Sequence, residues 1–325
     1  MNRLLRILGG AMIVLTATAA TEAPASTESG TIRVWSSEAM RGVVTRWQQG
    51  FRRHHPGISI VSTPSGTDVA MAGLYTGRAD LALMGREATA SEVQAFEWIF
   101  RTKPARVEIM NGSVAATEKS PALVVFVHPD NPLAKLTLAQ LDAIFGYEHR
   151  RGADPIVTWG GLGLGGDWAA RPIDLYGPDT TSGTGIFFRH AVLNDSRNLN
   201  WDRMREFSGR SAGRQILDAL ARDRFGIAVA DLGSAGSGVK ALALAADERG
   251  PFVNATAESV GSRTYPLTRT AFALFKRMPG RPIDPKIEEF LSYILSDEGQ
   301  AEVGREGDYL RLPAGVAREQ VRTLE

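Results

Sequence analysis

The sequence predicts an α/β fold built on parallel sheets. Short apolar runs with strand character alternate along the chain with segments whose apolar residues recur every three or four positions, as in helices. Such alternation favours parallel strands joined by helical crossovers. At 325 residues, with 43% hydrophobic and 22% charged residues, the chain has the composition of a soluble globular protein and can bury one or two full cores.

The first 25 residues have the pattern of a signal peptide. Arg3 and Arg6 give a basic start, residues 4–15 are mostly apolar, and small residues with plausible cleavage sites follow. An uncleaved membrane anchor is the alternative, but the apolar segment is short for a span of about 20 residues. We therefore expect cleavage, export to the periplasm and a soluble mature chain.

Charge and cysteine content exclude several kinds of partner and chemistry. Lys and Arg number 37 and Asp and Glu 36, and removal of residues 1–25 leaves 35 of each. A neutral chain gives no electrostatic argument for nucleic acid or an acidic membrane surface. The absence of cysteine excludes disulfides, thiolate nucleophiles and Cys-ligated zinc. The five histidines are scattered, and the adjacent His54 and His55 do not share a helix face, so we expect neither a metal nor a cofactor.

Three junctions share one pattern, in which hydroxyl-bearing or glycine residues follow a strand and precede a helix. They are Ser36 and Ser37 after the strand at 31–35, Ser65, Gly66 and Thr67 after the strand at 58–61, and Ser182, Gly183 and Thr184 after the run ending at Tyr176. Free backbone N–H groups and the helix dipole favour an anion at such junctions. The alternative is an ordinary N-cap that satisfies only its own helix.

The other segments continue the alternation. Arg86 follows the strand at 79–84, and ligands of open α/β sheets collect outside the carboxyl ends of strands, although a solvated arginine is the alternative. The apolar run 122–127 predicts a strand buried on both faces, and Thr137 caps the next helix. Residues 160–166 contain the dinucleotide-binding spacing of glycines, but no buried strand precedes them, so they predict a flexible surface loop.

Seven short motifs in register resemble the periplasmic phosphate-binding proteins of ABC transporters, over nearly all of residues 31–313. The motifs are Ser36-Ser37, Ser65-Gly66-Thr67, residues 80–86, Asn131-Pro132-Leu133 with the helix after it, Ser182-Gly183-Thr184, Tyr265-Pro266-Leu267 and Glu298-Gly299-Gln300.

The resemblance implies a type II periplasmic-binding-protein fold of two lobes, each a mostly parallel sheet flanked by helices, with the ligand cleft between them and a two-stranded hinge. One lobe would hold residues 27–125 and 266–325, and the other residues 126–265. The anion would be bound by residues of the three junctions and by one cation: Ser36, Ser37, Ser65, Gly66, Thr67, Arg86, Ser182, Gly183 and Thr184.

One departure from the family pattern concerns charge. Members often carry an arginine a few residues before Ser-Gly-Thr, but residues 176–179 contain no basic side chain. Either Arg86 supplies the cation alone or the ligand is not phosphate, and we expect the first. A carboxylate in the site would accept the proton of hydrogen phosphate and repel sulfate. Asp179 is the candidate for this role, followed by Glu38 and Asp68.

The expected function is therefore capture of phosphate, or a similar tetrahedral oxyanion, by a monomer that presents it to a membrane permease. A binding module that serves a sensor or a secretion system remains open. An exported serine-dependent hydrolase is the enzyme alternative, but no Gly-x-Ser-x-Gly motif surrounds Ser182, and His190 lies two turns along the same predicted helix, too far to act as its base. We thus expect no catalysis.

Overall fold

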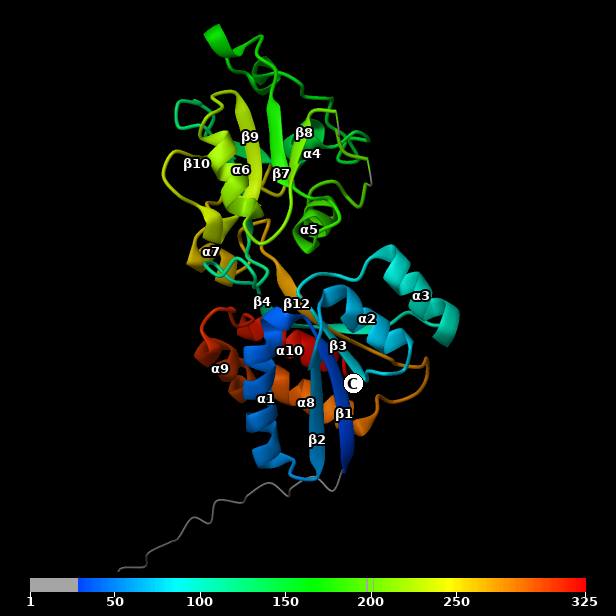
Figure 1. Cartoon of the computed structure of the whole chain (residues 1–325). Coiled ribbons are helices and arrows are strands. Elements are labelled where there is room, and N and C mark those ends of the chain that lie inside the picture. Colours follow the sequence, from blue (N-terminus) through cyan, green and yellow to red (C-terminus); the bar gives the residue numbers. More distant parts are fainter. Residues whose placement is uncertain (1–28, 197, 201) are drawn as a thin grey trace, which may run out of the picture.

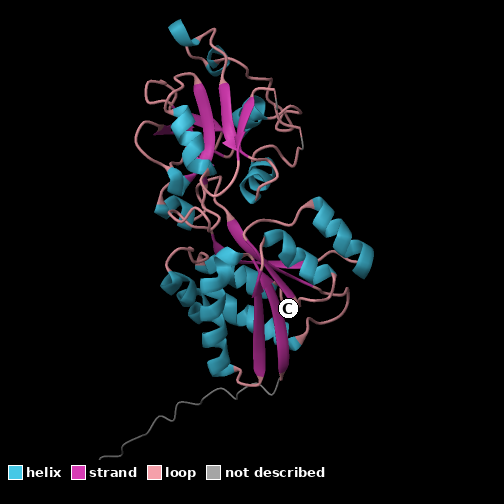
Figure 2. Cartoon of the chain, viewed as in Figure 1, coloured by secondary structure: helices cyan, strands magenta, loops and turns pink. Residues whose placement is uncertain are grey.

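The computed structural model describes residues 29–196, 198–200 and 202–325, so the expected signal peptide at 1–25 lies outside the described residues. Two sheets, each flanked by helices, form two lobes that lie one above the other (Figures 1 and 2). Within the described parts of the chain, no helix is long and apolar enough to cross a membrane.

The first lobe, the lower one in Figure 1, contains a five-stranded sheet in the order β2-β1-β3-β12-β4. Its strands are β1 (Gly30–Ser36), β2 (Ile58–Pro64), β3 (Leu81–Met84), β4 (Ala105–Asn111) and β12 (Thr270–Phe275). The strand β1 pairs in parallel with β2 and β3, whereas β12 runs antiparallel to β3 and β4. The late strand β12 therefore lies between strands from the beginning of the chain.

Helices cover both faces of this sheet. They are α1 (Arg41–His54), preceded by the 3-10 turn η1 (Glu38–Met40), α2 (Thr67–Tyr75), α3 (Ala90–Phe100), α8 (Pro285–Leu295), α9 (Asp297–Glu306) and α10 (Ala314–Arg322). On β3, Leu81 and Leu83 pack into the core shared with α1 and α8, while Ala82 and Met84 pack with α2 and α3. This alternation follows from the two-residue period of a strand and explains why β3 is apolar at every position.

The second lobe contains a five-stranded sheet in the order β10-β5-β9-β7-β8 and a separate β11-β6 pair. Its strands are β5 (Leu123–Val127), β6 (Lys135–Thr137), β7 (Asp174–Pro178), β8 (Met204–Phe207), β9 (Gly226–Asp231), β10 (Lys240–Ala241) and β11 (Ala243–Ala245). Each five-stranded sheet combines two parallel and two antiparallel pairings, so the sheets are mixed where the sequence predicted mostly parallel ones.

The second lobe also has helices on both faces. They are α4 (Leu138–Phe145), α5 (Gly183–Ala191), α6 (Ala212–Leu220) and α7 (Ala257–Gly261), with the 3-10 turns η2 (Trp159–Leu162), η3 (Gly166–Trp168) and η4 (Leu232–Ser234). On β5, Val125 and Val127 pack with α4 and α5, and Val124 and Phe126 pack with α6. All five residues of β5 are buried, as the apolar run predicted. Of the glycine-rich residues 160–166, residues 160–162 lie in η2, residues 163–165 form the connection and Gly166 begins η3.

Two segments cross between the lobes side by side. The Gly112 amide donates to the Arg269 carbonyl oxygen at 2.9 Å, and the Leu123 amide donates to that of Leu267 at 3.1 Å. The Tyr265 hydroxyl also donates to the Leu123 carbonyl oxygen at 2.9 Å. Because β5 begins at Leu123 and belongs to the second sheet, the boundary expected after residue 125 falls inside this strand.

Candidate functional site

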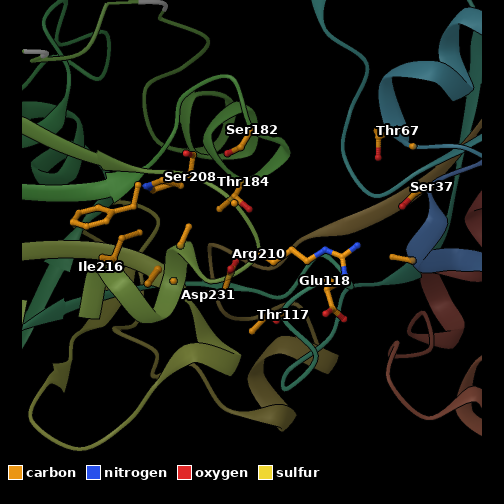
Figure 3. A pocket seen from close by; sticks show the side chains of 18 of the residues that line it. Ser37, Thr67, Thr117, Glu118, Ser182, Thr184, Ser208, Arg210, Ile216 and Asp231 are labelled. Atoms are coloured by element: carbon orange, nitrogen blue, oxygen red, sulfur yellow. The ribbon is translucent and has the colours of Figure 1, made fainter. Parts of the chain in front are cut away.

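A cavity of about 800 Å³ lies between the two lobes, and residues of both lobes and of the first crossover line it (Figure 3). The lining residues are Ser37, Glu38, Ala39, Gly66, Thr67, Thr117, Glu118, Pro178, Ser182, Thr184, Phe207, Ser208, Gly209, Arg210, Ala212, Gly213, Ile216, Ala230 and Asp231. Each of the three junctions predicted from the sequence contributes to this lining.

The first lobe presents two of these junctions. The Ser37 amide donates to the Leu83 carbonyl oxygen at 3.1 Å, which holds the end of β1 beside β3. Next to it, the amides of Ser65 and Gly66 both donate to the Ser36 carbonyl oxygen, at 3.0 and 3.3 Å. Gly66 has a φ of 120°, a conformation that favours glycine, and α2 begins immediately after it without a side-chain cap. The first amides of α2 are therefore left for a partner in the cavity.

The second lobe presents the third junction at the start of α5. The Ser182 side chain accepts a hydrogen bond from the Gly185 amide at 3.1 Å, so this serine is an N-cap. A Cβ atom at Gly185 would lie 2.3 Å from the Asp179 carbonyl oxygen, and only glycine fits this close turn. Thr184 follows in the first turn and lines the cavity. This stretch therefore caps α5 and also lines the cavity.

A fourth helix start, at α6, also reaches the cavity through residues 208–210, Ala212 and Gly213. The helices α2, α5 and α6 thus begin at one cavity, α2 from the first lobe and the other two from the second. The partial positive charge of each start adds to that of the others. Backbone amides and hydroxyls that converge in this way are suited to an oxyanion.

Arg86, the cation expected from the sequence, does not line this cavity. Its side chain is 3% exposed and is held by Asp68 at 2.5 Å and by Glu92 at 2.8 Å. Burial opposes the charge of Arg86, but the hydrogen bonds to Glu92 and Asp68 outweigh it and raise the pKa of the guanidinium. The charge that was expected to meet the anion is therefore already neutralised by two carboxylates.

The other predicted residues divide into two groups. Ser37, Gly66, Thr67, Ser182 and Thr184 meet at the cavity, whereas Ser36, Ser65, Gly183 and Asp179 are not part of its lining. Asp179 instead binds the amide and the hydroxyl of Thr181, both at 2.8 Å. Of the two further candidate acids, Glu38 lines the cavity and Asp68 pairs with Arg86.

Two charged residues at or near the cavity, Asp231 and Arg269, could not be recognised from the sequence. Arg269 is 5% exposed and donates to the Thr184 hydroxyl at 3.2 Å and to the Gly85 carbonyl oxygen at 3.3 Å, so it connects the lobes. Burial lowers its pKa, and the nearby Asp231 partly opposes this. Burial also raises the pKa of Asp231 to about 6, against the opposite effect of Arg269. Asp231 is therefore an acid of the cavity that protonates readily.

The possible metal ligands and the Ser182 hydroxyl were both considered in the sequence, and the structure shows how they are arranged. Among the described residues, no three His, Cys, Asp or Glu side chains are grouped as metal ligands would be. The Ser182 hydroxyl donates to the Asp179 carbonyl oxygen at 2.5 Å, and His190 is bound to Glu87 and Asp195. Because the Ser182 hydroxyl hydrogen is held by the backbone and both ring nitrogens of His190 are engaged by carboxylates, these two residues do not form the serine–histidine pair of a hydrolase.

Comparisons of the sequence agree with this arrangement. Residues 21–298 match the family model described as a PBP superfamily domain. The phosphate-binding protein PstS of Pseudomonas aeruginosa is 32% identical over 301 residues, which cover 92% of this chain and 88% of that protein. Protein SphX of Synechococcus elongatus is 24% identical and covers 81% of this chain, with 72% of its own length matched.

Solved structures show the same fold. An ABC-type phosphate transport receptor from Vibrio cholerae matches 87% of this chain over its whole length, with a TM-score of 0.57 and 19% identity. PstS from Borrelia burgdorferi matches 88% of this chain over its whole length, with a TM-score of 0.58 and 16% identity.

Proposed function

Since this chain belongs to the PBP superfamily, and within it to the family of the phosphate-binding protein PstS, we propose that it captures inorganic phosphate for an ABC-type importer. One observation carries the proposal: helix starts from both lobes converge on one cavity that lies between them. Hydrogen bonds from these amides, together with the hydroxyls of Ser37, Thr67 and Thr184, would replace the water shell of the anion.

The two-lobed arrangement supports capture by closure. Since each lobe supplies part of the lining, an anion bound to both is held more tightly when the lobes approach each other, and it shifts the population toward the closed form. The proposed division assigns residues 29–122 and 268–325 to one lobe and 123–267 to the other, because β5 begins at Leu123 and the Leu123 amide donates to the Leu267 carbonyl oxygen.

A carboxylate in the cavity would make the site selective for an anion that carries a proton. We assign this role to Asp231 instead of Asp179, because Asp231 lines the cavity whereas Asp179 binds Thr181. Hydrogen phosphate can donate its proton to a carboxylate, whereas sulfate, fully ionised at neutral pH, would meet only repulsion. Glu38 is a second acceptor on the opposite lobe.

The proposed setting is the periplasm, with a membrane permease as partner and a monomer as the working form. The basic and apolar start of the chain supports export, and the relatives named as phosphate-binding or phosphate transport proteins support the transport role. The relatives are binding proteins, and the proposal includes no catalytic step.

Titration calorimetry of the mature protein with phosphate, arsenate, sulfate and molybdate tests the function. We expect one site per chain, phosphate and arsenate bound with similar affinity, and sulfate and molybdate bound far more weakly. Small-angle scattering should show a smaller radius of gyration at saturating phosphate. Tight binding of sulfate with none of phosphate would contradict the proposal, as would phosphate-ester hydrolysis that Ser182→Ala abolishes.

A further inference from the structure

We infer that Arg210 supplies the guanidinium that contacts the captured anion, an inference that rests on the proposed function. Among the described residues that line the cavity, Arg210 is the only cation, and the lining also contains the acids Glu38, Glu118 and Asp231. An oxyanion entering between three acids gains from a cation that offsets their charge. Arg210 therefore supplies the positive charge that the cavity lining otherwise lacks.

The two buried arginines near the cavity are already engaged. Arg86 is held by Asp68 and Glu92, and Arg269 donates to Thr184 and Gly85. In contrast, Arg210 forms no hydrogen bond, ion pair or ring contact with any described residue. Its side chain is exposed, so the charge stays hydrated until a ligand arrives. Arg210 is thus the cation whose contacts a ligand can complete without breaking an existing pair.

The local backbone places Arg210 beside the predicted anion-binding turn. The Asp179 amide donates to the Phe207 carbonyl oxygen at 2.8 Å, which ties the loop before α5 to the loop before α6. Gly209, with a φ of 87°, turns the chain just before Arg210. In Figure 3 the Arg210 side chain extends from the second lobe across the cavity toward the side that holds Ser37. A guanidinium in this place can bind an oxyanion with two parallel N–H donors.

The alternative partner for the Arg210 guanidinium is the Glu118 carboxylate, which lies on the same side of the cavity in Figure 3. If the lobes close, Arg210 could pair with this carboxylate and act as a lock on the closed form, without touching the anion. The two roles predict opposite effects of neutralising Glu118. Removal of a competing acid strengthens an Arg210–anion contact, whereas removal of a partner weakens a lock.

Calorimetric titration of phosphate into four variants tests the inference. Arg210→Ala should raise the Kd by about a hundredfold, and Arg210→Lys should recover only part of the affinity because an ammonium lacks the paired donors. Arg214→Ala is the matched control, since Arg214 is exposed on α6, the helix that begins just after Arg210, but does not line the cavity, and the Kd of this variant should stay within about twofold of the parent value. Glu118→Gln should leave phosphate binding unchanged or tighter.

The titrations of Arg210→Ala and Glu118→Gln can each contradict the inference. If Arg210→Ala binds phosphate as the parent does, Arg210 does not contact the anion. If Glu118→Gln weakens binding as much as Arg210→Ala, the partner of Arg210 is Glu118 and the inference is wrong. If the parent protein binds no phosphate, both the proposed function and this inference are wrong. The titration of the parent is therefore carried out before any variant is compared.

Discussion

The Nε2 atom of His190 lies 2.8 Å from Oε2 of Glu87, and this ion pair connects the second lobe to the first outside the cavity. His190 is on α5, and Glu87 follows β3. Asp195 holds the other ring nitrogen of His190 at 2.9 Å, and Arg106 holds the other oxygen of Glu87 at 2.8 Å. The hydrogen bond to Glu87, opposed by burial, raises the pKa of His190 to about 9, and the same bond lowers the pKa of Glu87 to about 2.

This pair should make stability depend on pH. The folded pKa of His190 is raised above its ordinary value of 6.5, so its contribution is complete below about pH 6.5 and is lost as the pH rises through about 9. His190→Gln should therefore lower the free energy of unfolding most near pH 6 and have little effect above pH 9. His190 is 43% exposed, so the maximum effect should be about 0.2–1 kcal/mol.

Denaturant titrations of parent and variant at several pH values between about 6 and 10 measure this difference. Glu87→Gln is the matched variant, because it leaves the imidazole in place while removing the partner that raises its pKa most; Asp195 raises this pKa as well. The variant should therefore weaken the same pH dependence in this range without abolishing it. A stability difference between parent and His190→Gln that stays constant from about pH 6 to pH 10 would rule out the raised pKa.

Arg86 should matter for stability and only weakly for ligand affinity. Removing one partner of a buried ion pair leaves the other charge uncompensated and costs about 3–5 kcal/mol. Arg86→Ala leaves Glu92, which is mostly buried, without its cation, although the exposure of Asp68 moderates the loss. We expect destabilisation of about 2–4 kcal/mol and little change in phosphate affinity for the molecules that stay folded.

Thermal denaturation and calorimetry on the same preparation separate the two effects. Arg52→Ala, an exposed arginine on α1 of the same lobe, serves as the control and should change neither quantity. The opposite pattern, an unchanged melting temperature with binding weakened by about a hundredfold, would restore Arg86 to the role that the sequence alone predicted.

The elements that could be predicted from the sequence are those set by local patterns. The three strand–turn–helix junctions depend on apolar periodicity and on capping residues within a few positions, and Ser37, Thr67 and Ser182 do meet at one cavity. The mixed direction of the sheets could not be predicted in this way, because β12 joins the first sheet from far along the chain. Strand direction at that position depends on the crossover and not on the strand's own residues.

The charges of the site were the hardest feature to predict. Arg86 has the expected place after a strand, but its partners come from the helices α2 and α3, and nothing in a linear pattern shows that Asp68 and Glu92 reach the same guanidinium. Arg269 and Asp231 lie 38 positions apart on different segments, so only the fold brings them near each other. Arg210 stands in a short Gly-Arg-Ser stretch that is typical of an ordinary surface loop.

Arg269 should stabilise the contact between the lobes. Arg269→Met keeps the length of the side chain but removes the hydrogen bonds to Thr184 and Gly85 and leaves Asp231 without its nearby cation. We expect a loss of about 2–4 kcal/mol in the free energy of unfolding near neutral pH. Equilibrium unfolding in urea measures this loss, and adding Asp231→Asn should recover more stability than the same substitution gains in the parent. If the two substitutions prove additive, the charges of Arg269 and Asp231 are not coupled.

Asp231→Asn should make the protein more stable near neutral pH. Burial raises the folded pKa of Asp231 from 3.8 to about 6, so the fold favours the neutral acid. The stabilising contribution is present below about pH 3.8 and is lost as the pH rises through about 6, because the charged form must then be kept in a poorly hydrated place. An amide has no charge to bury, so the variant should gain on the order of 1–3 kcal/mol over the parent at about pH 7.5 and nothing near pH 3.5.

The same substitution should cost selectivity, because the acceptor of the phosphate proton becomes an amide that can also donate. Phosphate affinity should fall and sulfate affinity should rise, since the like charge that repels sulfate has been removed. Calorimetric titrations of both anions give the ratio of the two dissociation constants, and Asp218→Asn, which removes an exposed acid on α6 outside the cavity lining, is the control that should leave this ratio unchanged. The contrary result is an Asp231→Asn variant that is more stable near neutral pH and yet discriminates against sulfate as well as the parent does. That result would show that Asp231 does not accept the phosphate proton, and Glu38 on the opposite lobe would be the acceptor to test next.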